Sequence, residues 1–170
     1  MSVVNYDTYI GKYTGTKIAD GKRRCDFILT DTGTDNVIIL CEVTSSIGGI
    51  ENLSRPIEKT KKDGTRTVVF PRGKYQKVEL QLYQSLETLT EVPSIASYIN
   101  SKKRKVCLMS YLIKRTENNA INAFNRNRLM EAEEAGENGA QISCSQIEQF
   151  GFDYYRISHD YSFKIDNNRK

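Results

Sequence analysis

The chain has 170 residues, of which 38% are hydrophobic and 27% charged, with a net charge of +4. A chain of this length is expected to form one domain, residues 1–170, that buries roughly two thirds of its unfolded surface. No apolar run approaches the ~20 residues needed to span a bilayer, and the N-terminus lacks a signal-peptide pattern. We therefore expect a cytoplasmic protein with no membrane partner.

Cysteine and histidine usage excludes several kinds of site. The four cysteines contain no C-x-x-C pair, and three of them lie in apolar runs, so we expect reduced, buried thiols rather than a zinc site. A single histidine cannot build a multi-histidine metal centre. The sequence also contains no Walker loop, no Gly-x-Gly-x-x-Gly and no Gly-x-Ser-x-Gly, which leaves nucleotide-driven motors, dinucleotide enzymes and serine hydrolases unsupported.

The N-terminal part of the chain reads as strands and turns. Strands are predicted over 3–14, 23–30 and 37–44, the last two joined by a polar turn over 31–36. Residues 45–72 form a long basic excursion, with a short hairpin of 58–62 and 65–70 around Asp63-Gly64.

Helical periodicity dominates the next part. Helices are predicted over 74–91, 94–100 and 117–135, and the apolar run 106–113 predicts a buried strand. A helix between two strands of one sheet implies that those strands are parallel. The remaining pieces, which we expect to close the sheet, are 142–147, 152–157 and 161–165.

Two carboxylates stand at the apolar hairpin. Asp26 precedes Phe27, and Glu42 follows a nearly continuous Val/Ile run. Because side chains alternate across a strand, Glu42 and Thr44 should share a face with Leu40. A carboxylate there is costly to bury unless it is paired or binds a cation, and hard divalent ions prefer oxygen ligands. Both residues could instead be strand-end carboxylates that reach solvent or pair with a basic side chain.

Asp26, followed by a turn and then Glu42-Val43-Thr44, resembles the core of the PD-(D/E)XK nucleases. The resemblance covers about residues 24 to 115 and implies an α/β, restriction-endonuclease-like fold with a central mixed sheet flanked by helices. It further implies that Asp26, Glu42 and the carbonyl of Val43 bind Mg²⁺ or Mn²⁺. Thr44 stands where the family has a lysine that assists the attacking water, so Thr44 is a departure inside the catalytic motif.

The helix over 74–91 offers a substitute for that lysine. In many members of this family the helix after the motif contributes a Lys, Gln or Tyr to the site. Lys77 is our candidate for the relocated lysine and Gln81 for a supporting residue. Both could equally be ordinary solvent-facing helix residues.

Basic residues crowd the stretch before and at the start of this helix. We predict that five of them contact a nucleic acid backbone: Lys61, Lys62, Arg66, Arg72 and Lys74. The alternative, solvated loop charge, is equally consistent with the sequence. DNA is favoured over RNA as the partner, and a homodimer or a protein partner is left open.

Three functions follow from these patterns. The first is a metal-dependent nucleic-acid phosphodiester hydrolase of the endonuclease type, using Asp26 and Glu42. The second, which Thr44 favours, is a catalytically inactive protein of the same fold that binds nucleic acid or protein. In the third, both carboxylates are structural.

Overall fold

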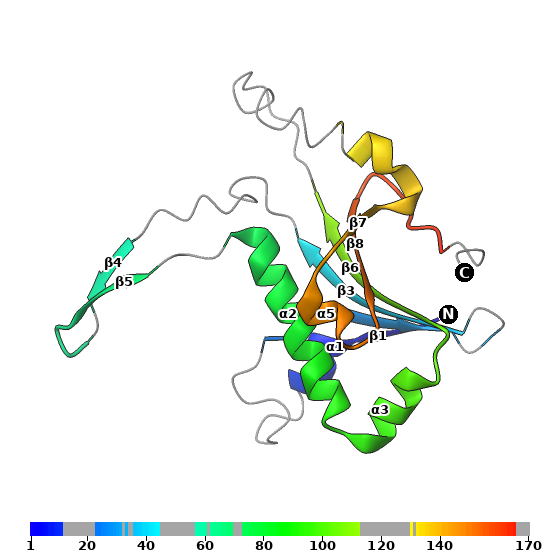
Figure 1. The fold of residues 1–170 in the computed structure, drawn as a ribbon, viewed down its shortest axis with the longest axis horizontal. Coiled ribbons are helices and arrows are strands. Elements are labelled where there is room, and N and C mark those ends of the chain that lie inside the picture. The colour runs from blue at the N-terminus through cyan, green and yellow to red at the C-terminus, as the bar shows by residue number, and fades with distance from the viewer. Residues whose placement is uncertain are drawn as a thin grey trace.

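The computed structural model describes residues 1–11, 23–31, 33, 36–44, 57–60, 62–69, 73–112, 130 and 132–165. The protein is an α/β structure built on one six-stranded open sheet with helices packed against it (Figure 1). The described residues contain no helix that is both long and apolar enough to cross a membrane.

The large sheet is mixed. Its strands lie in the order β1-β2-β3-β6-β8-β7, where β3 pairs in parallel with β6, and β6 with β8, while the other pairs are antiparallel. The bounds of these strands, in chain order, are Ser2–Asn5, Phe27–Thr30, Val37–Thr44, Arg104–Tyr111, Ala140–Ile142 and Asp153–Ser158. The predicted central mixed sheet is therefore confirmed.

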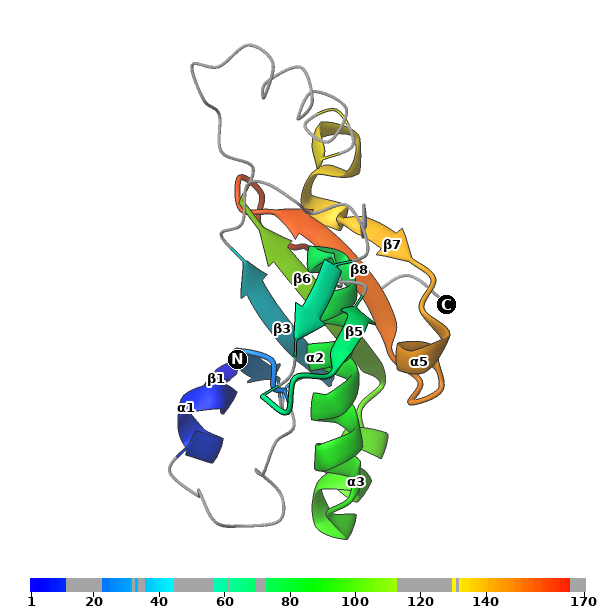
Figure 2. The same ribbon diagram turned by 90° about the vertical axis from the view of Figure 1, so that its left-hand side faces the viewer.

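Helix α2 (Lys74–Thr90) is the crossover that joins parallel strands β3 and β6, together with the short α3 (Pro93–Asn100). Its buried side chains, including Val78, Leu82 and Leu86, pack on the sheet face that carries Ile38 and Leu40. Figure 2 shows α2 lying across the sheet. The opposite face is covered in part by side chains of residues 161–165.

Smaller elements complete the description. Helix α1 (Tyr6–Gly11) follows β1, and a 3₁₀ turn (Gly136–Asn138) and α5 (Ser145–Glu148) flank β7. Residues 130 and 132–135 are helical, at the end of the predicted 117–135 helix, whose other residues lie outside the described part of the chain. Three of the cysteines are buried and free, as predicted: Cys25, Cys41 and Cys107.

The predicted N-terminal strand was wrong beyond Asn5. The chain turns there into α1, because the side chain of Asn5 accepts a hydrogen bond from the Thr8 N–H (2.9 Å), as a helix N-cap does. Tyr6 is buried in the core at this turn. The hairpin in the basic excursion is confirmed with shorter strands, β4 (Ile57–Thr60) and β5 (Arg66–Val69), and β6 begins two residues earlier than predicted.

The strand predicted over 23–30 is regular only from Phe27, since side chains of α2 replace the sheet ladder before it. The backbone N–H of Arg23 donates to Gln84 (2.9 Å) and that of Cys25 to Ser85 Oγ (2.8 Å). The hydroxyl of Ser85 in turn donates to the carbonyl of Gln81 (2.8 Å). The segment that carries Asp26 is therefore fastened to α2.

Replacing Ser85 with alanine should show how much the hydrogen bond between Cys25 and Ser85 contributes to the stability of the fold. Both Ser85 and Cys25 are fully buried, so Ser85→Ala leaves the Cys25 N–H without its acceptor. We expect the free energy of unfolding to fall by about 1–3 kcal/mol in a urea titration. Ser97→Ala, on the exposed side of α3, is the matched control and should change it by less than about 0.5 kcal/mol.

Candidate metal and catalytic site

Asp26 and Glu42 lie next to each other on neighbouring strands. The β2–β3 register pairs Phe27 with Cys41, and continuing it by one residue places Asp26 opposite Glu42. The carboxylate of Asp26 accepts a hydrogen bond from the Val43 N–H through Oδ2 (2.8 Å). The hairpin predicted to bring the two carboxylates together does so.

Glu42 shares a face of β3 with Leu40, as strand alternation predicted, and α2 covers that face. Its carboxylate Oε1 accepts a hydrogen bond from Nε2 of Gln81 (2.7 Å), and the same amide nitrogen donates to the carbonyl of Arg24 (3.1 Å). Gln81 therefore links the helix, the strand end and the segment before β2. The structure thus places Gln81 beside the carboxylates, while its supporting part in catalysis stays a prediction.

The second oxygen of Glu42 is unusual. Glu42 is only 5% exposed, and its buried Oε2 has no hydrogen-bond donor among the residues that the structure describes. Burial, and next the negative charge of Asp26, raise the pKa of Glu42 to about 7, although the Gln81 side chain, the charge of Lys74 and the backbone N–H of Asp26 act in the opposite direction. Near neutral pH this carboxyl group is therefore close to half protonated, and a bound cation would favour its charged form.

Of the two lysines at the start of α2, the one whose charge acts on Glu42 is Lys74. Lys74 is half-buried. Lys77, our sequence candidate for the catalytic lysine, is exposed and makes no hydrogen bond or ion pair with Asp26 or Glu42 in this structure. Its catalytic role remains a prediction.

Thr44 is buried (2% exposed) two residues beyond Glu42, on the same face of β3 and next to Tyr111 of β6. Its hydroxyl carries no charge, so it cannot reproduce the electrostatic effect of the family's lysine. Val43 points the other way and is 40% exposed. Val43 contacts Asp26 through its backbone N–H, and the predicted role of its carbonyl as a metal ligand is untested.

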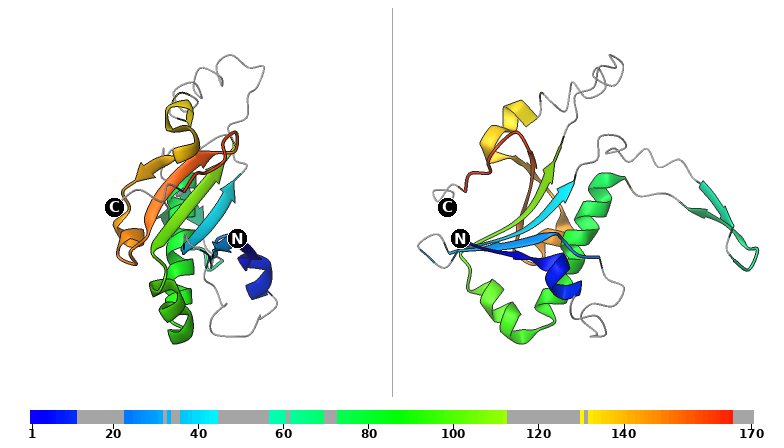
Figure 3. Two further views of the ribbon diagram at one scale, coloured as in Figure 1. Left: turned by 90° about the vertical axis from the view of Figure 1, so that its right-hand side faces the viewer. Right: turned by 180° about the vertical axis from the view of Figure 1, so that it is seen from behind.

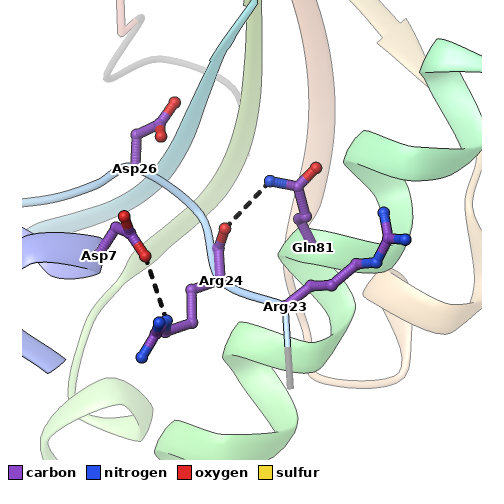
Figure 4. A pocket seen from close by; sticks show the side chains of 5 residues that line it. All are labelled: Asp7, Arg23, Arg24, Asp26 and Gln81. Atoms are coloured by element: carbon purple, nitrogen blue, oxygen red, sulfur yellow. Dashed lines mark hydrogen bonds and ion pairs between the residues drawn. The ribbon is translucent and has the colours of Figure 1, made fainter. Parts of the chain in front are cut away.

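An open pocket of about 310 Å³ adjoins this site, lined by Asp7, Arg23, Arg24, Asp26 and Gln81. Asp7, on α1, forms an ion pair with the guanidinium of Arg24 (Oδ1 to Nε, 3.2 Å). Figure 4 shows the Asp26 carboxylate turned away from that pair and the Arg23 side chain running along α2. The mouth of the site thus carries basic and acidic groups from α1 and from the segment before β2, and the neutral Gln81 from α2.

The other residues predicted to contact nucleic acid lie away from the carboxylates in the chain. Lys62 and Arg66 are exposed, at the turn and the start of β5. Lys61 and Arg72 lie outside the described residues. Lys74 lies outside this hairpin, at the start of α2, where its charge acts on Glu42.

The donor set suits a hard cation that keeps some of its water. Mg²⁺ is commonly held by one or two carboxylates together with substrate phosphates, and Asp26 and Glu42 supply two. In the part of the chain that the structure describes, no group of three or more His, Cys, Asp or Glu side chains could hold a metal ion. The fit to a divalent ion therefore depends on the buried, undonated Oε2 of Glu42.

Cysteine chemistry is not favoured at this site. Burial raises the pKa of both Cys25 and Cys41 to about 12, so these thiols near the two carboxylates stay protonated.

Two features of the site were not predicted from the sequence. Asp7 was assigned to a strand, and the Asn5 cap three residues before Thr8 was the signal that could have placed it on a helix. Lys74 was assigned to backbone binding, although it stands seven residues before Gln81 and so on the same side of α2.

Stability should depend on pH through Glu42. Because its pKa is raised from 4.5 to about 7, the folded protein holds a proton in this window that the unfolded chain has lost. Without divalent cations, the free energy of unfolding should therefore fall as pH rises from 5 to 8, by about 2–3 kcal/mol from this group.

Glu42→Gln removes this titration while keeping an oxygen for Gln81. We expect its stability relative to wild type to rise by the same about 2–3 kcal/mol between pH 5 and pH 8 in urea titrations with EDTA. Glu133→Gln, at an exposed carboxylate, is the control and should show no such trend. A difference between Glu42→Gln and wild type that does not change with pH would contradict the assignment.

Comparison of the chain with models of known protein families, with curated proteins and with solved structures found no match. The site is accordingly interpreted from its own residues and contacts. The structure has an α/β architecture with a mixed six-stranded sheet flanked by helices, and it carries two adjacent carboxylates beside a polar pocket.

Proposed function

We propose that the protein is a metal-dependent nucleic-acid phosphodiester hydrolase of restriction-endonuclease-like fold. The observation that carries this proposal is the buried Glu42 carboxylate beside Asp26, with one oxygen undonated. The order of elements supports the fold assignment, since an antiparallel hairpin is followed by a crossover helix and a parallel strand. DNA is the proposed substrate, in preference to RNA.

Asp26 and Glu42 would hold Mg²⁺ or Mn²⁺ in this proposal. When bound, such an ion lowers the pKa of its water and stabilises negative charge on a phosphate. Gln81 keeps the Glu42 carboxylate in place through Oε1, so that Oε2 stays available. Lys74 supplies a positive charge near Glu42 and takes over the electrostatic part that Thr44 lacks.

A second candidate is a protein of this fold that binds nucleic acid without cutting it. The neutral Thr44 in the motif favours it, since no lysine occupies that position. In this case divalent ions and Glu42 would affect stability but not produce cleavage. The two candidates therefore differ in one measurable property, the cleavage of nucleic acid in the presence of a divalent ion.

Cleavage assays test the proposal directly. With Mg²⁺ or Mn²⁺, wild type should cut DNA, and EDTA should abolish the activity. Asp26→Asn and Glu42→Gln should each lower the rate by at least about a hundredfold, because each removes a ligand charge. Glu133→Gln should retain the wild-type rate. A folded wild type that is inert on DNA and RNA with either ion would favour the second candidate.

Lysine variants identify the group that replaces the motif lysine. We expect Lys74→Ala to lower kcat by about a hundredfold and to move the acidic limb of the pH–rate profile to higher pH, because Lys74 lowers the pKa of Glu42. Lys77→Ala should have the smaller effect. If only Lys77→Ala lowers kcat, the lysine predicted from the sequence is the catalytic one. Lys103→Ala, exposed before β6, controls for loss of general positive charge.

A further inference from the structure

The β4–β5 hairpin is a separate, two-stranded sheet. We call residues 57–69 the basic arm, of which the structure describes 57–60 and 62–69. Its strands pair with each other, from Ile57 opposite Val69 to Thr60 opposite Arg66, and with no other described strand. Figures 1 and 3 show the arm standing clear of the six-stranded sheet. A two-stranded hairpin on its own is only marginally stable in water, so we expect this one to serve a function other than stabilising the fold.

In sequence, the basic arm stands between two elements of the proposed site, β3 and α2. The chain leaves β3 at Thr44, two residues after Glu42, and returns at Lys74, whose charge acts on Glu42. In the chain, the arm therefore lies between the strand that carries Glu42 and the helix that carries Lys74 and Gln81.

Positive charge is concentrated in this part of the chain. Residues 55–77 hold eight of the 25 Lys and Arg residues but only two of the 21 Asp and Glu residues, a net charge of +6. The basic arm itself, residues 57–69, holds four of these basic residues and both acidic ones, a net charge of +2, and the chain outside residues 55–77 is −2. Lys62 and Arg66, near the tip, are exposed.

The tip is held in shape by its own turn. The Thr65 N–H donates to the Asp63 carboxylate (2.9 Å), and Gly64 has φ +84°, a conformation that side-chain-bearing residues rarely adopt. Lys62 and Arg66 are therefore presented on a preorganised turn, which reduces the entropy lost when they meet a ligand.

We propose that the basic arm binds duplex DNA by entering a groove, with Lys62 and Arg66 on the phosphates. This inference rests on the proposed function and narrows its substrate. The major groove of B-DNA, about 12 Å wide, admits a two-stranded β-ribbon, whereas that of A-form RNA is deep and narrow. Single strands offer no groove, so the arm selects double-stranded DNA. The exposed Lys62 and Arg66 near its tip also suit phosphates better than an apolar protein surface.

Binding without cleavage tests the proposal. Wild type in EDTA is titrated into a fluorescent 20-base-pair DNA duplex, the matching RNA duplex and one DNA strand, with anisotropy as readout. We expect the DNA duplex to bind tightest. Lys62→Gln/Arg66→Gln should weaken that binding about tenfold and reduce the slope of log K against log salt by about 1.8, the value for two lost phosphate contacts.

The control removes the same charge elsewhere. Lys103→Gln/Lys164→Gln alters two exposed lysines outside the arm and should change affinity by less than about threefold. Equal binding of the arm variant and wild type, equal binding of all three nucleic acids, or no binding at all would overturn the proposal.

The two proposals fail separately. DNA cleavage by a protein whose arm variant binds normally would refute the arm's role and leave the nuclease standing. If duplex binding depends on the arm but the protein never cuts, the nuclease proposal is refuted and the arm's role stands.

Discussion

The buried carboxylate of Glu42 is the constraint on which the account of this site depends. An ionised group at the end of an apolar strand is costly unless a donor, a cation or a proton compensates it. Gln81 compensates Oε1, and Oε2 is left for a proton or a cation. The burial of this carboxylate, with no donor at Oε2, explains both the raised pKa of Glu42 and the proposed affinity for a divalent ion.

Helix α2 makes this arrangement possible because one of its faces is apolar and its neighbouring positions are polar. Leu82 and Leu86 anchor the helix on the sheet, while Gln81 and Ser85 reach the strand end and the segment before β2. The helix therefore places the carboxylates as well as covering them. Lys74 begins the same helix, so Lys74 and Gln81 share one rigid element.

Much of this could be predicted from the sequence where local rules decide. Alternation in the Val/Ile run predicted that Glu42 shares a face with Leu40, and the apolar periodicity of residues 74–91 predicted α2. The ion pair of Asp7 with Arg24 and the hydrogen bonds of Gln81 could not be predicted, because they join segments about 20 to 60 residues apart. At Asn5, a local cap outweighed the loose strand pattern of residues 3–14, which shows how a single side chain can end a strand.

Calorimetric titration of Mn²⁺ into wild type, at pH 6 and pH 8 in buffers of different ionisation enthalpy, tests the central claim most directly. If the cation takes the place of a proton on Glu42, binding should release close to one proton at pH 6 and almost none at pH 8, and should be tighter at pH 8. Both effects should vanish in Glu42→Gln. Mn²⁺ binding that is absent, or unchanged in Glu42→Gln, would contradict the assignment of Asp26 and Glu42 as a cation site.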